Sequence, residues 1–92
     1  MAELLHEIWK MEEGAFSCDR VCKKSDEFRT AFYPNALLIY RFTAKSDHEA
    51  FQKNHDWHGF GRWKPVEGYR ECFFTEEEAE KQRQYLAVRN ID

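Results

Sequence analysis

Long hydrophobic runs are absent from this sequence, and so is a leader-like start. No apolar stretch approaches the roughly 20 residues that a membrane-spanning helix needs. Residues 1–7, Met-Ala-Glu-Leu-Leu-His-Glu, have neither the basic start nor the apolar block of a signal peptide. We therefore expect a cytoplasmic protein that has no contact with a membrane.

Cysteine, proline and glycine are also scarce. The three cysteines, Cys18, Cys22 and Cys72, are an odd number, so reduced thiols are expected in place of a disulfide framework. With two prolines and four glycines the chain has no linker-like tract, and it contains neither a repeat nor a low-complexity segment. Residues 1–92 are therefore predicted to form one compact domain.

A basic excess is missing as well. The formal net charge is −3, which excludes a strongly basic nucleic-acid binder. The charges are nevertheless grouped, because residues 1–19 hold five acids and one lysine, and three cations, Arg20, Lys23 and Lys24, follow directly. Such patches steer charged partners, so we expect this basic group to set the rate of association more than the final affinity.

The usual phosphate-binding signatures are not present. The chain has no Gly-x-x-x-x-Gly-Lys loop, and Gly59-Phe60-Gly61 is too short to indicate a Gly-x-Gly-x-x-Gly nucleotide site. No cofactor is therefore expected.

Aromatic residues, in contrast, are abundant. Eight phenylalanines, four tyrosines and three tryptophans make fifteen in all. Each can bury roughly 150–250 Å², so they can supply much of the hydrophobic core. A large core matters here because the domain is near the size below which disulfides or metal ions are usually needed for stability.

The first element is predicted to be a helix over residues 2–13. Its apolar residues recur at helical spacing: Leu4, Leu5, Ile8 and Trp9. The segment is rich in helix formers, and Gly14 suits a C-terminal cap. The competing interpretation is a strand over residues 5–12 that turns at Glu13-Gly14 into a second strand. Both remain open, and the helix is favoured.

Two strands flank a short helix in the next part of the chain. Strands are predicted over residues 15–22 and 36–43, and a helix begins at Ser25 and ends before Pro34. Residues 36–43, Ala-Leu-Leu-Ile-Tyr-Arg-Phe-Thr, give the clearest strand pattern. We expect this strand in the centre of the sheet.

Two capping boxes mark the later helices. Ser46-Asp47-His48-Glu49 predicts a helix to about residue 55, and Thr75-Glu76-Glu77-Glu78 predicts a helix over residues 76–89. Between them, residues 69–74 are predicted to form a strand whose Cys72 and Phe73 support the fold.

This order of elements predicts a two-layer α+β domain. The helices pack on a small, mainly antiparallel sheet of three or four strands. A ferredoxin-like split β-α-β arrangement is compatible with the connectivity.

Two ligand-like pairs raise the hypothesis of a zinc site. Cys18 and Cys22 have a permitted spacing, but His55 and His58 are one residue too close, and several elements separate the pairs. We therefore favour the interpretation that the cysteines are small buried residues and that the histidines border an aromatic loop.

Catalysis is not indicated by any residue pattern. Cys72 has no local signature of an activated nucleophile, so core packing is the favoured interpretation. The glutamates at 76–78 and 80 lie where a helix N-terminus is stabilised by acids. We predict that the protein is not an enzyme.

The most informative stretch is the aromatic and basic segment 57–64. Glycines at 59 and 61 give the backbone freedom to present large side chains, and Trp and Arg dominate interface hot spots. The predicted partner-binding residues are Trp57, Phe60, Arg62, Trp63 and Lys64, together with Arg20, Lys23 and Lys24. Whether Trp57 and Trp63 belong to the core or to an interface remains open.

These observations predict a small, non-catalytic regulatory or inhibitory protein. Its partner would be a protein or a protein–nucleic-acid complex, and it would act as a monomer or homodimer. Inhibitors, immunity proteins and adaptors are of this kind, including those that phages and mobile elements direct at nucleic-acid-processing complexes. Direct nucleic-acid contact is less favoured. The alternatives are a dimeric α+β barrel with a small-molecule pocket lined by aromatic residues and histidines, and a zinc-binding module.

Overall fold

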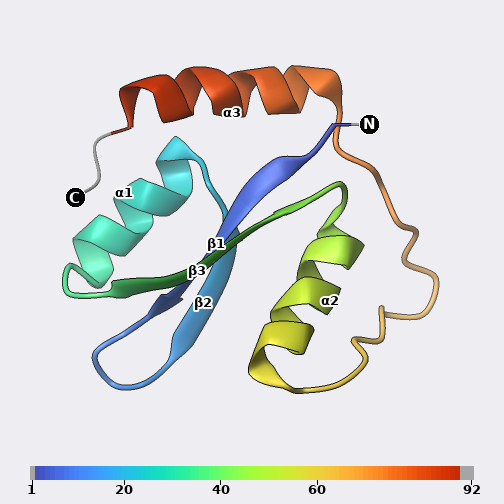
Figure 1. The fold of residues 1–92 in the computed structure, drawn as a ribbon, viewed down its shortest axis with the longest axis horizontal. Coiled ribbons are helices and arrows are strands. Elements are labelled where there is room, and N and C mark those ends of the chain that lie inside the picture. Colours follow the sequence, from blue (N-terminus) through green and yellow to red (C-terminus); the bar gives the residue numbers. More distant parts are fainter. Residues whose placement is uncertain (1, 90–92) are drawn as a thin grey trace.

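The computed structural model describes residues 2–89, which form one α+β domain with three strands and three helices (Figure 1). Its elements are β1 (Leu4–Lys10), β2 (Phe16–Arg20), α1 (Lys23–Phe32), β3 (Leu37–Ala44), α2 (Asp47–His58) and α3 (Glu76–Val88). Residues 1 and 90–92 of the predicted domain lie outside the described part. No helix among residues 2–89 has the length and apolar character required to cross a membrane.

The three strands form one antiparallel sheet in the order β2-β1-β3. Since β2 and β3 both run antiparallel to β1, they are parallel to each other, and α1 connects them across β1. This is a split β-α-β unit. The predicted α+β class with a small antiparallel sheet is confirmed, and residues 2–89 supply three strands. Figure 1 shows α1 and α2 on opposite sides of the sheet and α3 across one end.

The helix predicted over residues 2–13 is wrong, and the competing strand interpretation is correct. Residues 4–10 form the central strand β1, and a turn that includes Gly14, at a φ of 90°, leads into β2. Leu4 and Ile8 face one side of the sheet, whereas Leu5 and Trp9 face the other. Because β1 is covered on both faces, it carries apolar residues on both. In addition, His6 and Glu7 are polar but buried, so apolar and polar residues do not alternate along the strand as they do in a half-exposed strand.

The central position predicted for residues 36–43 is also wrong. β3 is an edge strand, and its first residues are open to solvent: Leu37 is 65% exposed. Its continuous apolar start resembles a doubly covered strand. In the structure some of these apolar residues, including Tyr40, remain on the surface.

Residues 69–74 do not form a strand. A single bridge joins Ser46 to Phe73, and the amide of Phe74 donates to Lys45 O at 2.9 Å. Cys72 and Phe73 are exposed, in contrast to the prediction that they support the fold. The segment thus pairs with residues 45 and 46, just beyond β3, and its buried anchor is Phe74.

Local signals located the helices with small shifts. α1 begins at Lys23, two residues before the predicted start, and Cys22 precedes it without a side-chain cap. The Thr75 capping box is present in full at α3. At α2 the Ser46 hydroxyl accepts from the Glu49 amide at 3.0 Å, but the Glu49 carboxylate accepts from the Lys45 amide. α2 also continues to His58, beyond the predicted end.

The apolar core lies mainly between the sheet and α2. One cluster there contains Ile8, Phe42, Ala44 and Ala50, and partly buried Cys18 and Ile39 pack against it. A second cluster joins the start of β1 to α3 through Ala2, Leu4, Phe74 and Ala79.

His6 connects these two clusters. Its ring stacks on Phe42 at a centroid distance of 5.3 Å and lies 5.8 Å from Phe74. Since Leu4 O can only accept, the contact at 3.0 Å makes Nδ1 the protonated nitrogen, and buried Nε2 has no described partner. Burial lowers the pKa of His6, so the imidazole is held neutral.

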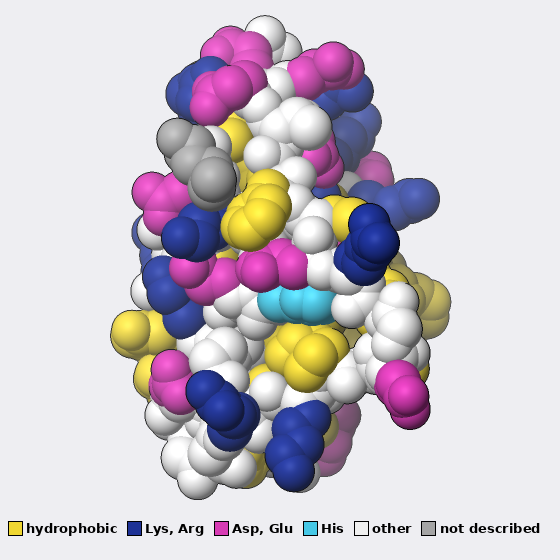
Figure 2. Space-filling view, turned by 90° about the vertical axis from the view of Figure 1, so that its right-hand side faces the viewer, with side chains coloured by type: hydrophobic (Ala, Val, Ile, Leu, Met, Phe, Trp, Pro, Cys, Tyr) yellow, Lys and Arg dark blue, Asp and Glu magenta, His cyan; other side chains and the backbone are white. Residues whose placement is uncertain are grey.

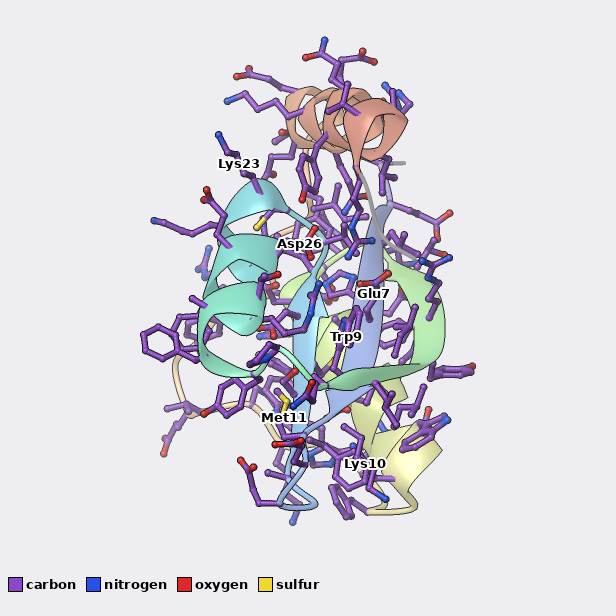
Figure 3. The ribbon with its side chains drawn as sticks, turned by 90° about the vertical axis from the view of Figure 1, so that its left-hand side faces the viewer. Glu7, Trp9, Lys10, Met11, Lys23 and Asp26 are labelled. Atoms are coloured by element: carbon purple, nitrogen blue, oxygen red, sulfur yellow. The ribbon has the colours of Figure 1, made fainter. Side chains whose placement is uncertain are left out.

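On the opposite face of β1, a buried ion network joins three elements. The Arg89 guanidinium donates to both oxygens of Glu7, at 2.6 and 2.8 Å, and to both oxygens of Asp26, at 2.7 and 2.8 Å. The side chains of Glu7 and Arg89 are 3% and 4% exposed. Figure 3 shows Glu7 on β1 and Asp26 on α1 directed into the space between strand and helix. Arg89 therefore links β1, α1 and the end of α3.

Further donors complete the coordination of the two carboxylates. Arg41 donates to Glu7 at 3.0 Å, and Arg29 to Asp26 at 2.9 Å. The Tyr85 hydroxyl also donates to Asp26. Burial acts to raise the pKa of both carboxyl groups, but the hydrogen bonds and positive charges outweigh it and hold each pKa below its ordinary value.

Gln82 fixes α3 to the end of the sheet. Its amide oxygen accepts from Leu5 N at 2.7 Å, and its amide nitrogen donates to Leu5 O at 3.0 Å and to Val21 O at 2.9 Å. The side chain thereby satisfies Leu5 N and Val21 O at the end of the sheet and adds a second donor to Leu5 O, which also accepts from Val21 N at 2.9 Å.

Arg89→Met is expected to lower the free energy of unfolding by about 3 kcal/mol, because it leaves two buried carboxylates incompletely paired. Urea denaturation measures the change. Arg83→Met is the control: Arg83 lies on α3, is exposed, and among residues 2–89 has Glu80 as its one ion-pair partner, so its loss should cost less than about 0.5 kcal/mol. Equal effects of the two substitutions would contradict the assigned role of Arg89.

Acidification is expected to reduce stability in two stages. In the unfolded chain His6 has the ordinary histidine pKa of 6.5, whereas in the folded protein its pKa is lower. The contribution of neutral His6 to the free energy of unfolding is therefore full above about pH 6.5 and falls as the pH drops toward the folded pKa. Glu7 and Asp26 contribute stability above the ordinary carboxyl pKa, and this is lost at more acid pH.

His6→Phe should remove only the first stage. Between about pH 7.5 and about pH 5, the free energy of unfolding measured with urea should fall less for the variant than for the wild-type protein. An unchanged loss would show that His6 titrates normally in the fold.

Candidate functional site

Exposed aromatic rings gather where β2, β3 and the end of α2 meet. This surface, called the aromatic end below, consists of Phe16, Tyr40, Trp57, His58 and Phe60. Trp57 lies 5.9 Å from Tyr40 and 6.1 Å from Phe16, measured between ring centroids. His58 lies 4.9 Å from Phe16 and stacks on Phe60 at 4.7 Å. The rings therefore form one connected surface.

The end of α2 explains how Phe60 joins this surface. Gly59 closes the helix with a φ of 74°, a conformation that side-chain-bearing residues rarely adopt. The chain then reverses, and the Phe60 amide donates to His55 O at 2.9 Å. Phe60 consequently lies over His55 and His58 with its ring 66% exposed. Trp57 and His58 belong to the helix itself.

Trp63 belongs to a second ring cluster on the outer side of α2. Its ring lies 4.9 Å from Phe51 and 5.1 Å from His48, and His48 also contacts Tyr69. Figure 2 shows a histidine in the middle of this face, with acidic side chains directly above it, a hydrophobic side chain directly below it, and lysine or arginine side chains further down. Trp63 is half-buried.

Gln52 holds the segment after Phe60 against α2. Its side-chain oxygen accepts from Trp63 N at 2.9 Å, and its nitrogen donates to Gly61 O at 3.3 Å. Arg62 and Lys64, on either side of Trp63, are exposed and form no ion pair with a described residue. The three large rings differ in exposure. Trp63 is the most covered, Trp57 is 40% exposed and Phe60 is the most exposed.

The structure does not bring Arg20 to segment 57–64. Arg20 lies at the far end of β2 from Phe16, where it pairs with Asp47 at 3.4 Å and Glu78 at 3.2 Å. Its guanidinium also covers the Phe74 ring at 4.7 Å. Arg20 therefore joins β2 to the starts of α2 and α3. Lys23 and Lys24 are exposed in the first turn of α1.

The four weak metal candidates occupy separate environments. Cys18 packs against the core, and burial, with a smaller contribution from Asp19, raises its pKa to about 11. The Cys22 sulfur lies 3.2 Å from the Ser25 hydroxyl, whereas His55 and His58 contact Phe60. Within residues 2–89 no group of three or more His, Cys, Asp or Glu side chains is arranged to hold a metal ion.

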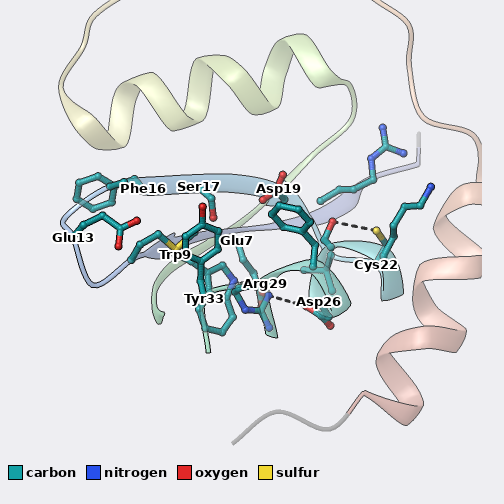
Figure 4. Close-up of a pocket in the computed structure, with 17 residues that line it drawn as sticks. Glu7, Trp9, Glu13, Phe16, Ser17, Asp19, Cys22, Asp26, Arg29 and Tyr33 are labelled. Atoms are coloured by element: carbon teal, nitrogen blue, oxygen red, sulfur yellow. Dashed lines mark hydrogen bonds and ion pairs between the residues drawn. The ribbon is translucent and has the colours of Figure 1, made fainter. Parts of the chain in front are cut away.

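A separate cavity of about 490 Å³ lies between α1 and the sheet. Figure 4 shows Trp9, Tyr33 and Asp19 among the residues around it. Arg29 covers the Trp9 ring at 3.6 Å, so part of the aromatic wall is already occupied by a cation. Burial raises the pKa of Asp19. No histidine lines the cavity.

Two members of the aromatic end were missed from the sequence. Phe16 and Tyr40 lie in predicted strands, where aromatic residues usually fill the core. Their position beside Trp57 depends on the register of β2 and β3 against β1 and on the length of α2. Alternation in the sequence shows on which side of a strand each ring lies but not whether the strand is at an edge, and the central position predicted for β3 favoured burial of Tyr40.

Comparison with protein-family models, with curated proteins and with solved structures gave no match.

Trp63→Ala is expected to lower the free energy of unfolding by about 2 kcal/mol, because it removes a half-buried ring from the surface of α2. Phe60→Ala should cost less than about 0.5 kcal/mol, since its ring is mostly in water. Urea denaturation of both variants compares the two values. A larger loss for Phe60→Ala would show that the aromatic end is structural.

Proposed function

We propose that this protein is a non-catalytic binding protein whose aromatic end contacts a macromolecular partner. The observation that carries the proposal is the connected surface of exposed rings from three elements. Four large rings are 40–66% exposed there, namely Phe16, Tyr40, Trp57 and Phe60. Exposed apolar patches of this kind are typical of interaction sites.

The chemistry of the surface supports a specific interface. Trp and Tyr provide large contact areas at a small cost in conformational entropy, and they are enriched among interface hot spots. Gly59 fixes the direction of Phe60, so part of the surface is ordered before a partner arrives.

Two cations that follow Phe60 in the chain support an acidic partner. Arg62 and Lys64 are exposed and unpaired among the described residues, so they are available to carboxylates. Arg20, the third cation of the predicted group beside Lys23 and Lys24, already has internal partners. The proposed interface therefore uses Arg62 and Lys64 and does not require Arg20. An inhibitor, immunity protein or adaptor would act through such a surface.

A small-molecule role is the second candidate, and the cavity beside α1 favours it. A volume of about 490 Å³ lies in the range of small-molecule sites. Its lining combines Trp9, Phe28 and Tyr33 with acidic groups, whereas the pocket predicted from the sequence contained His55 and His58. A ligand that raises Tm and is displaced by filling this cavity would favour this candidate over the first.

Phe60→Ala is expected to weaken capture of the partner at least about tenfold, because it truncates the most exposed ring of the aromatic end. The measurement is affinity purification from an extract of the native cells, followed by mass spectrometry and titration of the captured protein. Trp57→Ala should act in the same direction.

Phe32→Ala is the matched control, because Phe32 is also 66% exposed but lies on α1. It should leave capture unchanged. Equal capture by the Phe60 and Phe32 variants and the wild-type protein would refute the proposed role of the aromatic end.

A further inference from the structure

We propose that the outer edge of β3 and the crevice beside it bind an extended segment of a protein partner by strand addition. This inference rests on the proposed function, because it assigns a partner class and a binding mode to part of the aromatic end. Figure 1 shows β3 at the edge of the sheet with α2 beside it.

The first support is the direction of the β3 backbone. Thr43 O accepts from the Lys53 ammonium group at 2.6 Å, so this carbonyl points away from β1. In an antiparallel strand the amide and carbonyl of one residue point to the same side, and residues two apart share that side. The backbone groups of Arg41 and Thr43 therefore face outward. Among residues 2–89 no backbone group pairs with the outward groups of Arg41 and Thr43. The next outward carbonyl, Lys45 O, accepts from the Phe74 amide at 2.9 Å, so the open part of the edge ends at Thr43.

The second support is a crevice of about 350 Å³ between β3 and α2. It is lined by Tyr40, Phe42, Lys53, Asp56 and Trp57. A strand placed along β3 directs every second side chain to the α2 side of the sheet, over this crevice. An aromatic or branched aliphatic side chain suits its ring-lined walls. An open strand edge beside a side-chain pocket is the arrangement used in peptide recognition by strand addition.

The third support is the charge on the opposite side of the strand. The Arg41 side chain points away from α2 and is 48% exposed, with Glu7 as its ion-pair partner. The intervening side chains of an added strand would lie beside Arg41, where an acid is complementary. Lys53 supplies a second cation at the edge of the crevice. The preferred segment therefore alternates apolar and acidic residues.

Other occupants fit this edge less well. A second copy pairing through β3 would bring two sets of Arg41 and Lys53 to one edge, and such like charges oppose self-association. A nucleic acid has no row of amide donors and carbonyl acceptors at the spacing of a strand. The observations therefore favour a protein segment.

The test uses a displayed library of short random peptides selected on the wild-type protein. Selected sequences are expected to alternate apolar and acidic residues, and tryptophan fluorescence gives their Kd. Thr43→Pro removes one outward amide but no bond to β1, and proline is tolerated at such edge positions. It should weaken binding at least about tenfold. The control Thr43→Val keeps the amide and should change Kd by less than about twofold.

A second measurement does not depend on the folding of the proline variant. Two versions of a selected peptide are made, one methylated at the odd-numbered backbone amides and one at the even-numbered amides. The version whose methylated amides face β3 should not bind, and the other should bind normally. Failure of the library to give binders, equal binding to the Thr43→Pro and Thr43→Val proteins, or equal effects of both methylation registers would overturn the proposal.

The two proposals can fail separately. If Phe60→Ala prevents capture of the native partner and Thr43→Pro does not, the aromatic end binds its partner without strand addition. If selected peptides require the Thr43 amide but no native partner depends on Phe60, strand addition stands and the wider interface is wrong. A dimer that dissociates on Thr43→Pro would replace the partner with a second copy.

Discussion

The fold depends on the pairing of Arg89 with Glu7 and Asp26. Glu7 lies in the middle of the central strand and Asp26 in the first turn of α1, and their side chains are only 3% and 12% exposed. One planar guanidinium donates to all four of their oxygens. Lysine has no equivalent geometry. Because a cavity separates much of α1 from the sheet, this polar contact fixes the helix where apolar packing is sparse.

The two faces of β1 are stabilised by different means. The face toward α2 is apolar, with Ile8 fully buried and His6 stacked between aromatic rings. The face toward α1 carries Leu5 and Trp9 but also holds the ion network of Glu7. The apolar side positions α2 firmly, and α2 in turn places Trp57 and Phe60 beside Tyr40. The candidate binding surface thus derives its order from the better-packed half of the molecule.

Features set by neighbouring residues could be predicted from the sequence, and those set by distant ones could not. The Thr75 capping box needs only four consecutive residues, so α3 was located correctly. The identity of β1 was hidden because His6 and Glu7 are buried polar residues whose partners come from distant segments. β3 lies at the edge because β1 pairs with both other strands, and the apolar residues of β3 do not reveal this order. The sequence showed that segment 57–64 is rich in large side chains but left open which of them are exposed, and Phe16 and Tyr40 approach Trp57 only through sheet register.

The Arg89–Glu7 contact spans 82 residues of sequence, and the Gln82–Leu5 contacts span 77. Closing such long loops is slow relative to forming hairpins and helices. During synthesis Arg41 on β3 can pair with Glu7 as soon as the sheet forms, but Arg89 and Gln82 emerge last. Until the end of α3 leaves the ribosome, Glu7 and Asp26 lack the guanidinium that joins them, so folding is expected to complete as a late, cooperative step.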